Sequence, residues 1–534
     1  MKLDNKTSCL YIRSTFANQS LLTSSSKFIN PFFMDLQLSS FLILSSIILF
    51  ILMVLKMVMK PKSHSNLPPG PWKLPFIGNL HQSVLKLPHR ALRDLAKKHG
   101  PLMHLHVGEV PTLVVSSAEY AKEVMKTQDL IFASRPPLNA VKVITYDYTD
   151  IAFAPYGDYW RQLRKICTLE LLSSKRVQSF RLIREQNMSN FIEWIDSNSG
   201  SSINLTEKLY STTYTLLSEM IFGRTYGGQE EFISYAMKTL KLAGGFNILD
   251  MFPSMKLLHQ ITGENSKLEK LHEQSEEIVG NIINQHIKDS KTRKLDAEED
   301  LLDVLLKFHE EGDFPLTINN IKSVIKDMFG AGSETSATVV DWAIAEMMKN
   351  PRVMKKAQAE VRQVFDSRGI VDEKGIPDLN YLKLVIKETL RVHPPAPLLL
   401  PRENLESVVI DGYEIPVKTK VIVNGWAIGR DPKYWTDPET FYPERFLENS
   451  VDFKGTNFEY IPFGAGRRMI CPGMTFGLAN VELSLSQLLY YFDWKLPNEM
   501  NPEDLTMTEE FGITIRRRDD LYIIPIPYHP SPSH

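Results

Sequence analysis

The stretch PFGAGRRMICPG, residues 462–473, decides how the rest of the chain is interpreted. It places Cys471 in a glycine-rich loop directly before MTFGLANVELSLSQLLYYF, which has the pattern of a helix. The dipole and the free N–H groups of a helix N-terminus stabilise a thiolate. Pro472 has no N–H, so Gly473 and later residues have to supply the donors.

A tight, dry loop lined with donors is what a thiolate ligand of haem iron requires. Two other interpretations of the loop remain. Cys471 could be a buried structural cysteine in a turn. The loop could instead bind a dinucleotide, but G-A-G-R-R-M lacks the third glycine and no strand precedes it in a βαβ unit.

Two charged segments lie upstream of this loop. KETLRVHPP, residues 387–395, puts Glu388 and Arg391 on one helix face, where they can pair. PERF, residues 443–446, offers Arg445 as a third member. A surface pair of this kind contributes little to stability, whereas a buried triad would fix the backbone behind the cysteine loop. We therefore predict a structural role for the three residues.

A single long helix is expected over about 317–349, because its pattern continues until a proline at position 351. FGAGSETSA, residues 329–337, lies inside it. Gly330 and Gly332 each cost about 1 kcal/mol in a helix interior. Two of them at mid-helix predict a local distortion or the close approach of a flat ligand.

Glu334 and Thr335 follow, an acid beside an alcohol. Such a pair can hold water and pass protons to bound oxygen. The alternative is a solvated glutamate and a threonine that bonds back to its own helix.

Composition excludes several classes of protein. With 61 Lys and Arg against 63 Asp and Glu, the net charge is −2, which argues against nucleic-acid binding. Three cysteines cannot build a disulfide framework. A hydrophobic fraction of 43% is ample for a large core.

Residues 36–55, LQLSSFLILSSIILFILMVL, contain no charge and as a helix would span about 30 Å, the thickness of a bilayer core. Lys56, Lys60 and Lys62 follow, so the positive-inside rule places the rest of the chain in the cytosol. We expect one transmembrane anchor. A cleaved signal peptide is the alternative, but the run is long for one and no small-residue cleavage site follows.

Three further segments complete the organisation. Residues 1–33 are interpreted as a disordered or non-native extension before a natural start at Met34, with a transit peptide as the alternative. Residues 61–80 form a stiff hinge, with four prolines in its part 67–80. Residues 81–534 form one catalytic domain, mostly α with a small β-sheet region, because strand patterns occur only in short stretches such as 408–424.

Together these motifs resemble the cytochrome P-450s, which are haem–thiolate monooxygenases. The cysteine loop, the E-x-x-R helix, PERF, the A-G-x-E-T helix and the proline-rich elbow occur in the family's order. YGDYWRQLRKIC, NGWAIGRDPKYW and PFGAGRR are similar to plant microsomal members, closest to family 71, subfamily D. The resemblance implies a P-450 fold with one N-terminal transmembrane helix, held in the endoplasmic reticulum membrane with its catalytic domain in the cytosol.

The resemblance also implies a role for each motif residue. Cys471 would be the axial ligand of haem b, and Glu334 and Thr335 would be catalytic, delivering protons. The remaining cofactor-binding residues would be the propionate partners Trp160, Arg164, Arg402 and Arg468, the oxygen-groove residues Ala331 and Gly332, and the loop residues Phe463 and Gly473. The chain departs from the family spacing F-x-x-G-x-R-x-C-x-G, because two residues, not one, stand between Arg468 and Cys471.

Electrons would come from NADPH-cytochrome P-450 reductase, with cytochrome b5 as a second donor, and a basic patch of Arg161, Lys165 and Arg467 could dock the reductase. The substrate pocket implied by the family is nearly all apolar and without a fixed charge, which suits a lipophilic sesqui- or diterpenoid. Its candidate residues are Leu138, Val141, Ile144, Phe246, Ile248, Phe329, Ala396, Leu398, Leu399, Phe511 and Ile513.

Three alternatives to this function remain. The substrate could be an indole alkaloid or another aromatic compound. The extra loop residue could leave a haem-poor pseudoenzyme. A haem protein that isomerises or dehydrates its substrate without consuming oxygen is the third.

Overall fold

The computed structural model describes residues 41, 43–52, 66–82, 86–223, 229–242, 248–255, 263–290, 299–310, 314, 316–447, 449–469 and 471–529. The chain divides into two units, Met1–Lys62 and Ser63–His534. Residues 43–52 of the first unit are helical and their large apolar side chains are exposed. Among the described residues, none of the helices is both long and apolar enough to span a bilayer. The predicted extension 1–33, both ends of the predicted anchor 36–55 and the first residues of the hinge lie outside the described residues.

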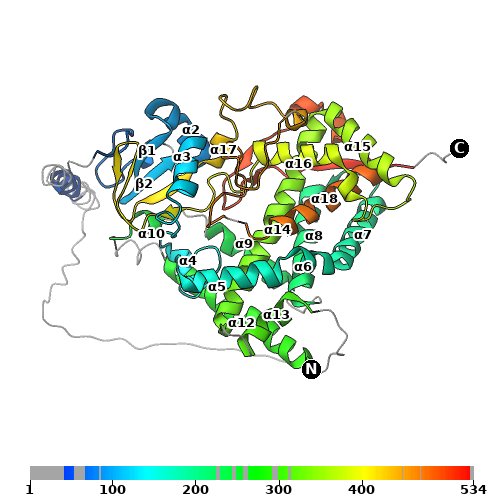
Figure 1. Ribbon diagram of the computed structural model, residues 1–534, viewed down its shortest axis with the longest axis horizontal. Helices are drawn as coiled ribbons and strands as arrows, with labels where there is room; N and C mark the ends of the chain where they lie inside the picture. Colours follow the sequence, from blue (N-terminus) through cyan, green and yellow to red (C-terminus); the bar gives the residue numbers. More distant parts are fainter. Residues whose placement is uncertain are drawn as a thin grey trace, which may run out of the picture. The chain divides into compact units, whose positions relative to one another are not determined.

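Helices make up most of the second unit (Figure 1). The first half of the chain contributes α2 (Pro88–His99), α3 (Ala118–Lys122), α4 (Asn139–Ile144), α5 (Asp158–Ile166), α6 (Ser174–Ser179), α7 (Arg181–Ser197), α8 (Leu205–Phe222), α9 (Gln229–Leu242) and α10 (Ile248–Met251). The second half contributes α12 (Glu264–Ser290), α13 (Leu301–Glu310), α14 (Ile318–Lys349), α15 (Pro351–Phe365), α16 (Asn380–Val392), α17 (Gly425–Ile428) and α18 (Met474–Tyr491).

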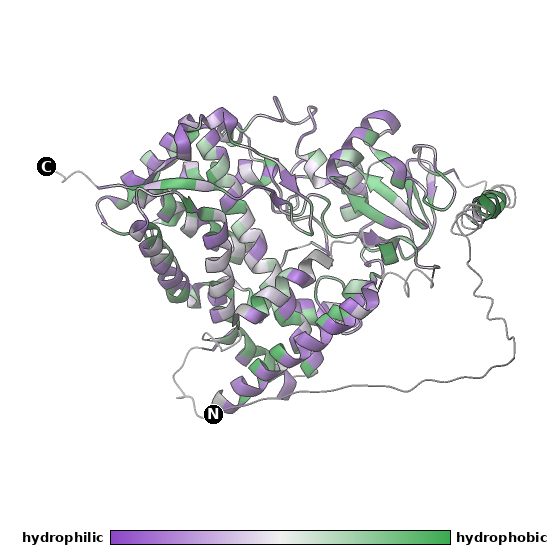
Figure 2. Ribbon diagram, turned by 180° about the vertical axis from the view of Figure 1, so that it is seen from behind, coloured by the Kyte–Doolittle hydropathy of each residue, from purple (hydrophilic) through white to green (hydrophobic). Residues whose placement is uncertain are grey.

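The strands form small sheets, as the sequence predicted. The largest has the order β1-β2-β7-β4 and consists of β1 (Leu102–Val107), β2 (Val110–Val115), β7 (Lys420–Val423) and β4 (Arg402–Glu403). The others pair β3 (Ile203–Asn204), β11 (Tyr522–Pro527) and β8 (Phe492–Lys495), then β5 (Val408–Ile410) with β6 (Tyr413–Ile415), and β9 (Glu509–Glu510) with β10 (Arg516–Arg517). Figure 2 shows the strands of the largest sheet as mostly hydrophobic.

The long helix α14 is the element on which the site is built. Thr317 caps its start, because the Thr317 hydroxyl accepts from the N–H of Asn320 at 3.2 Å and the Asn320 side chain accepts from the N–H of Thr317 at 2.9 Å. It ends at Lys349, where Pro351 begins the next helix. It packs against α8 and α18, and Figure 1 shows it crossing the helical part of the unit.

The predicted distortion at Gly330 and Gly332 is absent, because α14 is one uninterrupted helix over its 32 residues. Gly332 instead allows α8 to come close. A Cβ at Gly332 would lie 3.1 Å from the Leu217 Cδ1 atom and 3.8 Å from the Phe476 Cε1 atom. The missing side chain therefore makes room for neighbouring helices.

Candidate active site

Cys471 lies directly before the N-terminus of α18, two residues before the N-cap residue Gly473. Burial raises the pKa of the Cys471 thiol to about 11, although the backbone N–H of Gly473 and the nearby Arg164 guanidinium act to lower it. The thiol therefore stays protonated at neutral pH until a metal ion binds the sulfur, which deprotonates it. The Gly473 N–H and the Arg164 guanidinium would stabilise the resulting thiolate.

Two buried arginines are held by the cysteine loop and the loop before α5. Arg402, on β4, donates to the carbonyl of Ala465 at 2.9 Å and lies 3.4 Å from the Asp129 carboxylate. Arg468 donates to the carbonyls of Ala152, at 3.2 Å, and of Ala154. Both guanidinium groups are thus fixed by neutral backbone oxygens more than by acids.

Two more arginines join them. Arg135 donates to the carbonyls of Ala152, Leu400 and Pro401 at 3.0, 2.9 and 2.8 Å. Arg164, on α5, donates to the carbonyl of Met469 at 3.2 Å. Arg135 was not among the predicted site residues. The segment FASRPP contains no motif that distinguishes it, and the only signal is an arginine within an apolar segment.

These four residues, Arg135, Arg164, Arg402 and Arg468, form what we call the arginine cluster. Burial lowers the pKa of each guanidinium, that of Arg468 to about 9, and mutual repulsion lowers those of Arg135 and Arg468 further. The buried Nη1 atom of Arg468 has no hydrogen-bond partner among the described residues. A buried surplus of cations with a vacant donor fits a ligand that carries carboxylates.

Trp160 was predicted to bind a propionate through its indole. Its Nε1–H donates to the carbonyl of Ile151 at 2.9 Å. The guanidinium carbon of Arg468 lies 4.6 Å from the centre of its ring. The indole therefore supports Arg468 from one side, and direct contact with a ligand stays a prediction.

An acid pair connects α14 with the loop that holds these arginines. Asp327 accepts from the N–H groups of Ile151 and Ala152 at 3.0 and 3.2 Å. Burial raises the pKa of Asp150 to about 6, and burial followed by the Asp150 charge raises the pKa of Asp327 well above its usual value. The two carboxyls also share a hydrogen bond, which raises the pKa of Asp327 further.

A cavity that is partly open to solvent is lined by the segment that directly precedes Arg402 in the sequence. Six predicted substrate residues line it, namely Leu138, Ala396, Leu398, Leu399, Phe511 and Ile513. The other lining residues are Phe153, Pro397, Leu400, Pro401, Lys420, Ile422 and Gly512. Three of the five segments that were expected to form the substrate pocket therefore meet at this cavity, and the charged Lys420 lines it as well.

The other predicted substrate residues are not part of the lining of this cavity. Phe329 is fully buried, and its ring lies 4.5 Å from that of Phe232 and 5.5 Å from that of Tyr214. Val141 packs in an apolar cluster with the cavity-lining residues Leu138, Phe153 and Leu400. Two more belong to other small apolar clusters: Ile144 and Ile248. Phe246 lies outside the described residues.

Comparison with known proteins agrees with this geometry. A model of the family described as Cytochrome P450 matches residues 68–521. The chain belongs to the cytochrome P450 family. It is 55% identical over 489 residues to cytochrome P450 71D11 of Lotus japonicus, covering 90% of this chain and 99% of that protein. It is 52% identical over 499 residues to premnaspirodiene oxygenase of Hyoscyamus muticus, covering 92% and 99%.

The fold has solved counterparts. A zebrafish cytochrome P450 determined with abiraterone superposes with a TM-score of 0.69 at 25% identity, covering 83% of this chain and 99% of that chain. A P450 is a monooxygenase with a haem–thiolate centre, and the cysteine and arginines described above suit that group. Cys471 would supply the sulfur, and the unpaired Nη1 of Arg468 would supply a donor for a propionate.

The structure gives a partial answer to the irregular spacing of the P450 cysteine loop. Gly466 has a φ of 74°, and Arg468 is buried against Trp160. When the motif is aligned from Phe463 onward, Gly466 therefore falls where the backbone needs a glycine, and Arg468 falls at a buried position beside Trp160. Of the two residues between Arg468 and Cys471, Met469 is described and its carbonyl accepts from Arg164, whereas Ile470 lies outside the described residues.

The residues that the sequence predicts for the oxygen groove and for proton transfer lie on α14. Ala331 is exposed although most of its helix is buried, so this face of α14 borders open space. The half-buried Thr335 donates to the carbonyl of Ala331 at 2.5 Å. Glu334 lies near α8 and β10, where its charge contributes to the raised pKa values of Tyr214 and Arg516. The two residues are adjacent, but the threonine is bonded back to its own helix.

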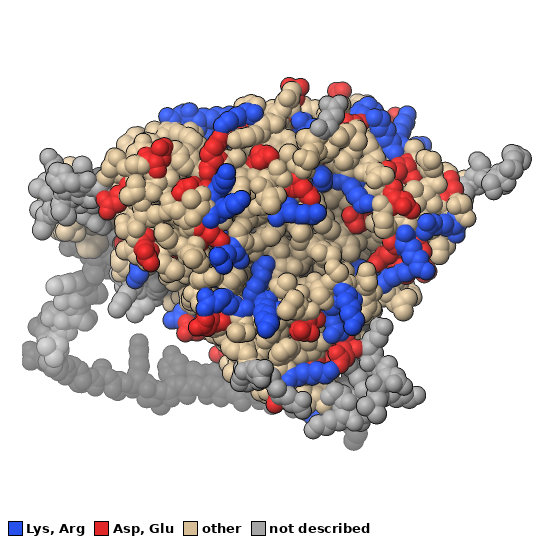
Figure 3. All heavy atoms as spheres, in the orientation of Figure 1, with Lys and Arg blue, Asp and Glu red and all other residues tan. Residues whose placement is uncertain are grey.

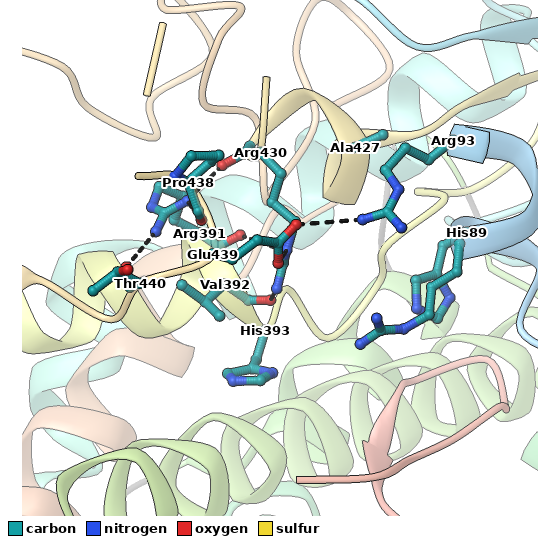
Figure 4. A network of polar contacts seen from close by, with 12 residues as sticks. His89, Arg93, Arg391, Val392, His393, Ala427, Arg430, Pro438, Glu439 and Thr440 are labelled. Carbon is teal, nitrogen blue, oxygen red and sulfur yellow. Dashed lines mark hydrogen bonds and ion pairs between the residues drawn. The ribbon is translucent and has the colours of Figure 1, made fainter. Parts of the chain in front are cut away.

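The predicted triad is buried and complete. Arg391 donates to both carboxylate oxygens of Glu388 at 2.8 Å, and Arg445 donates to the same carboxylate at 3.0 Å. Figure 4 shows Arg391 reaching the carbonyls of Pro438 and Thr440 as well, at 2.7 and 3.2 Å. The triad thus fixes the backbone that leads toward the P450 cysteine loop.

Proposed function

We propose that this P450 hydroxylates a sesqui- or diterpenoid in the endoplasmic reticulum membrane, with O2 and NADPH as co-substrates. The observation that carries the proposal is the apolar cavity formed by residues 138, 153, 396–401 and 511–513. Apolar walls bind a hydrocarbon skeleton by excluding water from it. The likeness to premnaspirodiene oxygenase, a protein named for a terpenoid, supports the same substrate class.

When bound, the haem supplies the activation of oxygen and its insertion into a C–H bond. The protein residues position it and manage charge. Cys471 provides the thiolate, while the arginine cluster neutralises the propionates. Glu334 and Thr335 move protons to the oxygen side, which requires the Thr335 hydroxyl to exchange its bond to Ala331 for a water.

The electron donor is an NADPH-dependent reductase, and cytochrome b5 is a second one. Arg161, Lys165 and Arg467 are exposed on or near α5, within reach of an acidic partner. Figure 3 shows basic side chains over this part of the viewed face, interspersed with acidic ones. This mixed pattern suits a transient partner better than a nucleic acid.

The membrane anchor is the segment 36–55. Its described part, residues 43–52, is a helix with exposed isoleucine, leucine and phenylalanine side chains, which are stable only in an apolar environment. One anchor and the proline-rich segment after it hold the catalytic domain at the membrane, where lipophilic substrates collect.

The test uses microsomes that contain this protein and a plant reductase, incubated with matched panels of terpenoids and indole alkaloids. We expect NADPH- and O2-dependent hydroxylation of at least one sesqui- or diterpenoid. Oxidation of the alkaloids alone would refute the substrate class. Haem content per polypeptide, measured on the same sample, separates a pseudoenzyme from an active enzyme with another substrate.

A further inference from the structure

Lys420 is a cationic side chain in the wall of an otherwise apolar cavity. It begins β7, where it stands opposite Thr112 of β2 and Glu403 of β4. Side chains alternate between the two faces of a strand, so Lys420 and Ile422 share one face. Both line the cavity, whereas Val421 of the other face packs into a separate apolar core. The register of the sheet therefore directs Lys420 toward the cavity.

The lysine amine is buried in the cavity wall beside an acidic side chain. It is 8% exposed, and burial lowers the pKa of its amine while the Asp250 carboxylate acts in the opposite direction. An apolar side chain would fill the same wall without this penalty. A buried amine in a ligand cavity is therefore a candidate for contact with the ligand.

Asp250 connects this lysine to the other wall of the cavity. It lies on α10 and accepts from the backbone N–H of Asn139 at 2.7 Å, at the start of α4. The preceding residue, Leu138, also lines the cavity. The hydroxyl of Tyr148 donates to the carbonyl of Leu138 at 3.1 Å, so that phenol is already engaged. The Asp250 carboxylate thus acts on Lys420 and also holds the start of α4, next to the cavity-lining Leu138.

We propose that Lys420 donates a hydrogen bond to a neutral oxygen of the substrate, a hydroxyl or a carbonyl, and so orients its apolar skeleton in the cavity. The inference rests on the proposed function, since it concerns the same cavity. A carboxylate is disfavoured, because together with Asp250 it would leave a net negative charge buried. The substrate is then a terpenoid that already carries one oxygen, so an earlier oxidation or hydration must supply it.

The test is a set of spectral binding titrations of the haem-loaded enzyme, which report affinity without turnover. One ligand set is a single terpenoid skeleton as the hydrocarbon, the alcohol, the ketone and the carboxylic acid. The second set consists of alkylimidazoles of several chain lengths with and without a terminal hydroxyl, which bind haem iron whatever the natural substrate is. The proteins are the wild type, Lys420→Met and, as a matched control, Lys418→Met, which removes an exposed lysine two residues away.

In the wild type we expect the alcohol or ketone to bind about tenfold more tightly than the hydrocarbon, the effect of a hydrogen bond from a charged donor. The carboxylic acid should show the smallest gain in affinity over the hydrocarbon. Lys420→Met should abolish the preference and Lys418→Met should keep it. Lys420→Gln, which retains a shorter uncharged donor, should keep part of it and supplies the result if the methionine variant does not fold.

Equal oxygen preference in the wild type and Lys420→Met, in both ligand sets, would overturn the inference, as would the lack of any preference in the wild type. A preference for the hydroxylated imidazoles that depends on Lys420, without a spectral response to any terpenoid, would support the lysine's role. That result would at the same time refute the terpenoid substrate.

Discussion

Replacing Gly466 with alanine tests whether the cysteine loop is held by the geometry described above. Gly466 has a φ of 74°, and a Cβ there would lie 2.0 Å from the Met125 carbonyl oxygen and 2.9 Å from the Asp129 Oδ1 atom. The left-handed conformation costs a residue with a side chain about 1 kcal/mol. Displacing a packed backbone adds about 1–3 kcal/mol. We expect Gly466→Ala to lower the free energy of unfolding by about 2–4 kcal/mol.

The matched control is Gly369→Ala. Gly369 has a φ of 70°, but nothing lies within 4 Å of the position of its Cβ, so only the conformational cost applies. Urea unfolding followed by tryptophan fluorescence compares the two variants. Because Asp129 also contacts Arg402, Gly466→Ala should lower haem content per polypeptide as well. Equal losses of stability and full haem content in both variants would refute the reasoning.

Three further substitutions probe the site and the core. Cys471→Ser is expected to abolish the thiolate absorption of the reduced carbon monoxide complex, and an unchanged spectrum would contradict the assignment of the ligand. Arg135→Gln should weaken haem retention about tenfold in transfer to apomyoglobin, whereas the exposed Arg161→Gln should not; equal retention in both would argue against the arginine cluster. Burial raises the pKa of Asp341 to about 6, so the native state binds this proton more tightly than the unfolded chain does. The free energy of unfolding of the wild type should therefore fall by up to about 3 kcal/mol as the pH rises from 4 to 6. Asp341→Asn should lack that decline in chemical unfolding, and parallel profiles would show that Asp341 does not titrate in this range.

The sequence predicted the parts of the site that depend on local pattern. Cys471 before a helix, Glu388 and Arg391 one turn apart, and Thr317 at a helix start are all visible within a few residues. Each occupies the local position expected of it. The P450 family also follows from such motifs, because their order along the chain is specific.

Features that depend on packing between distant segments were not predictable. Gly332 suggested a distorted helix, but its missing side chain serves the approach of Leu217 from α8. Phe329 looked like a pocket residue, yet its ring turns toward Phe232 and Tyr214. Lys420 was not predicted as a pocket residue, because only the register of the sheet places it in the cavity wall. In each case the deciding neighbour comes from another part of the chain.

The arginine cluster explains why haem and protein depend on each other. Buried cations are stable only when opposite charge compensates them, and the removal of one partner costs several kcal/mol. Asp129 lies within ion-pair distance of Arg402, and the Asp150 charge acts on Arg135 and Arg468, so two acids face the four guanidinium groups. The propionates of haem would supply the missing anions at the vacant Nη1 of Arg468. The same surplus of positive charge that would bind the haem propionates would make the haem-free protein less stable, so haem loading should raise the unfolding temperature.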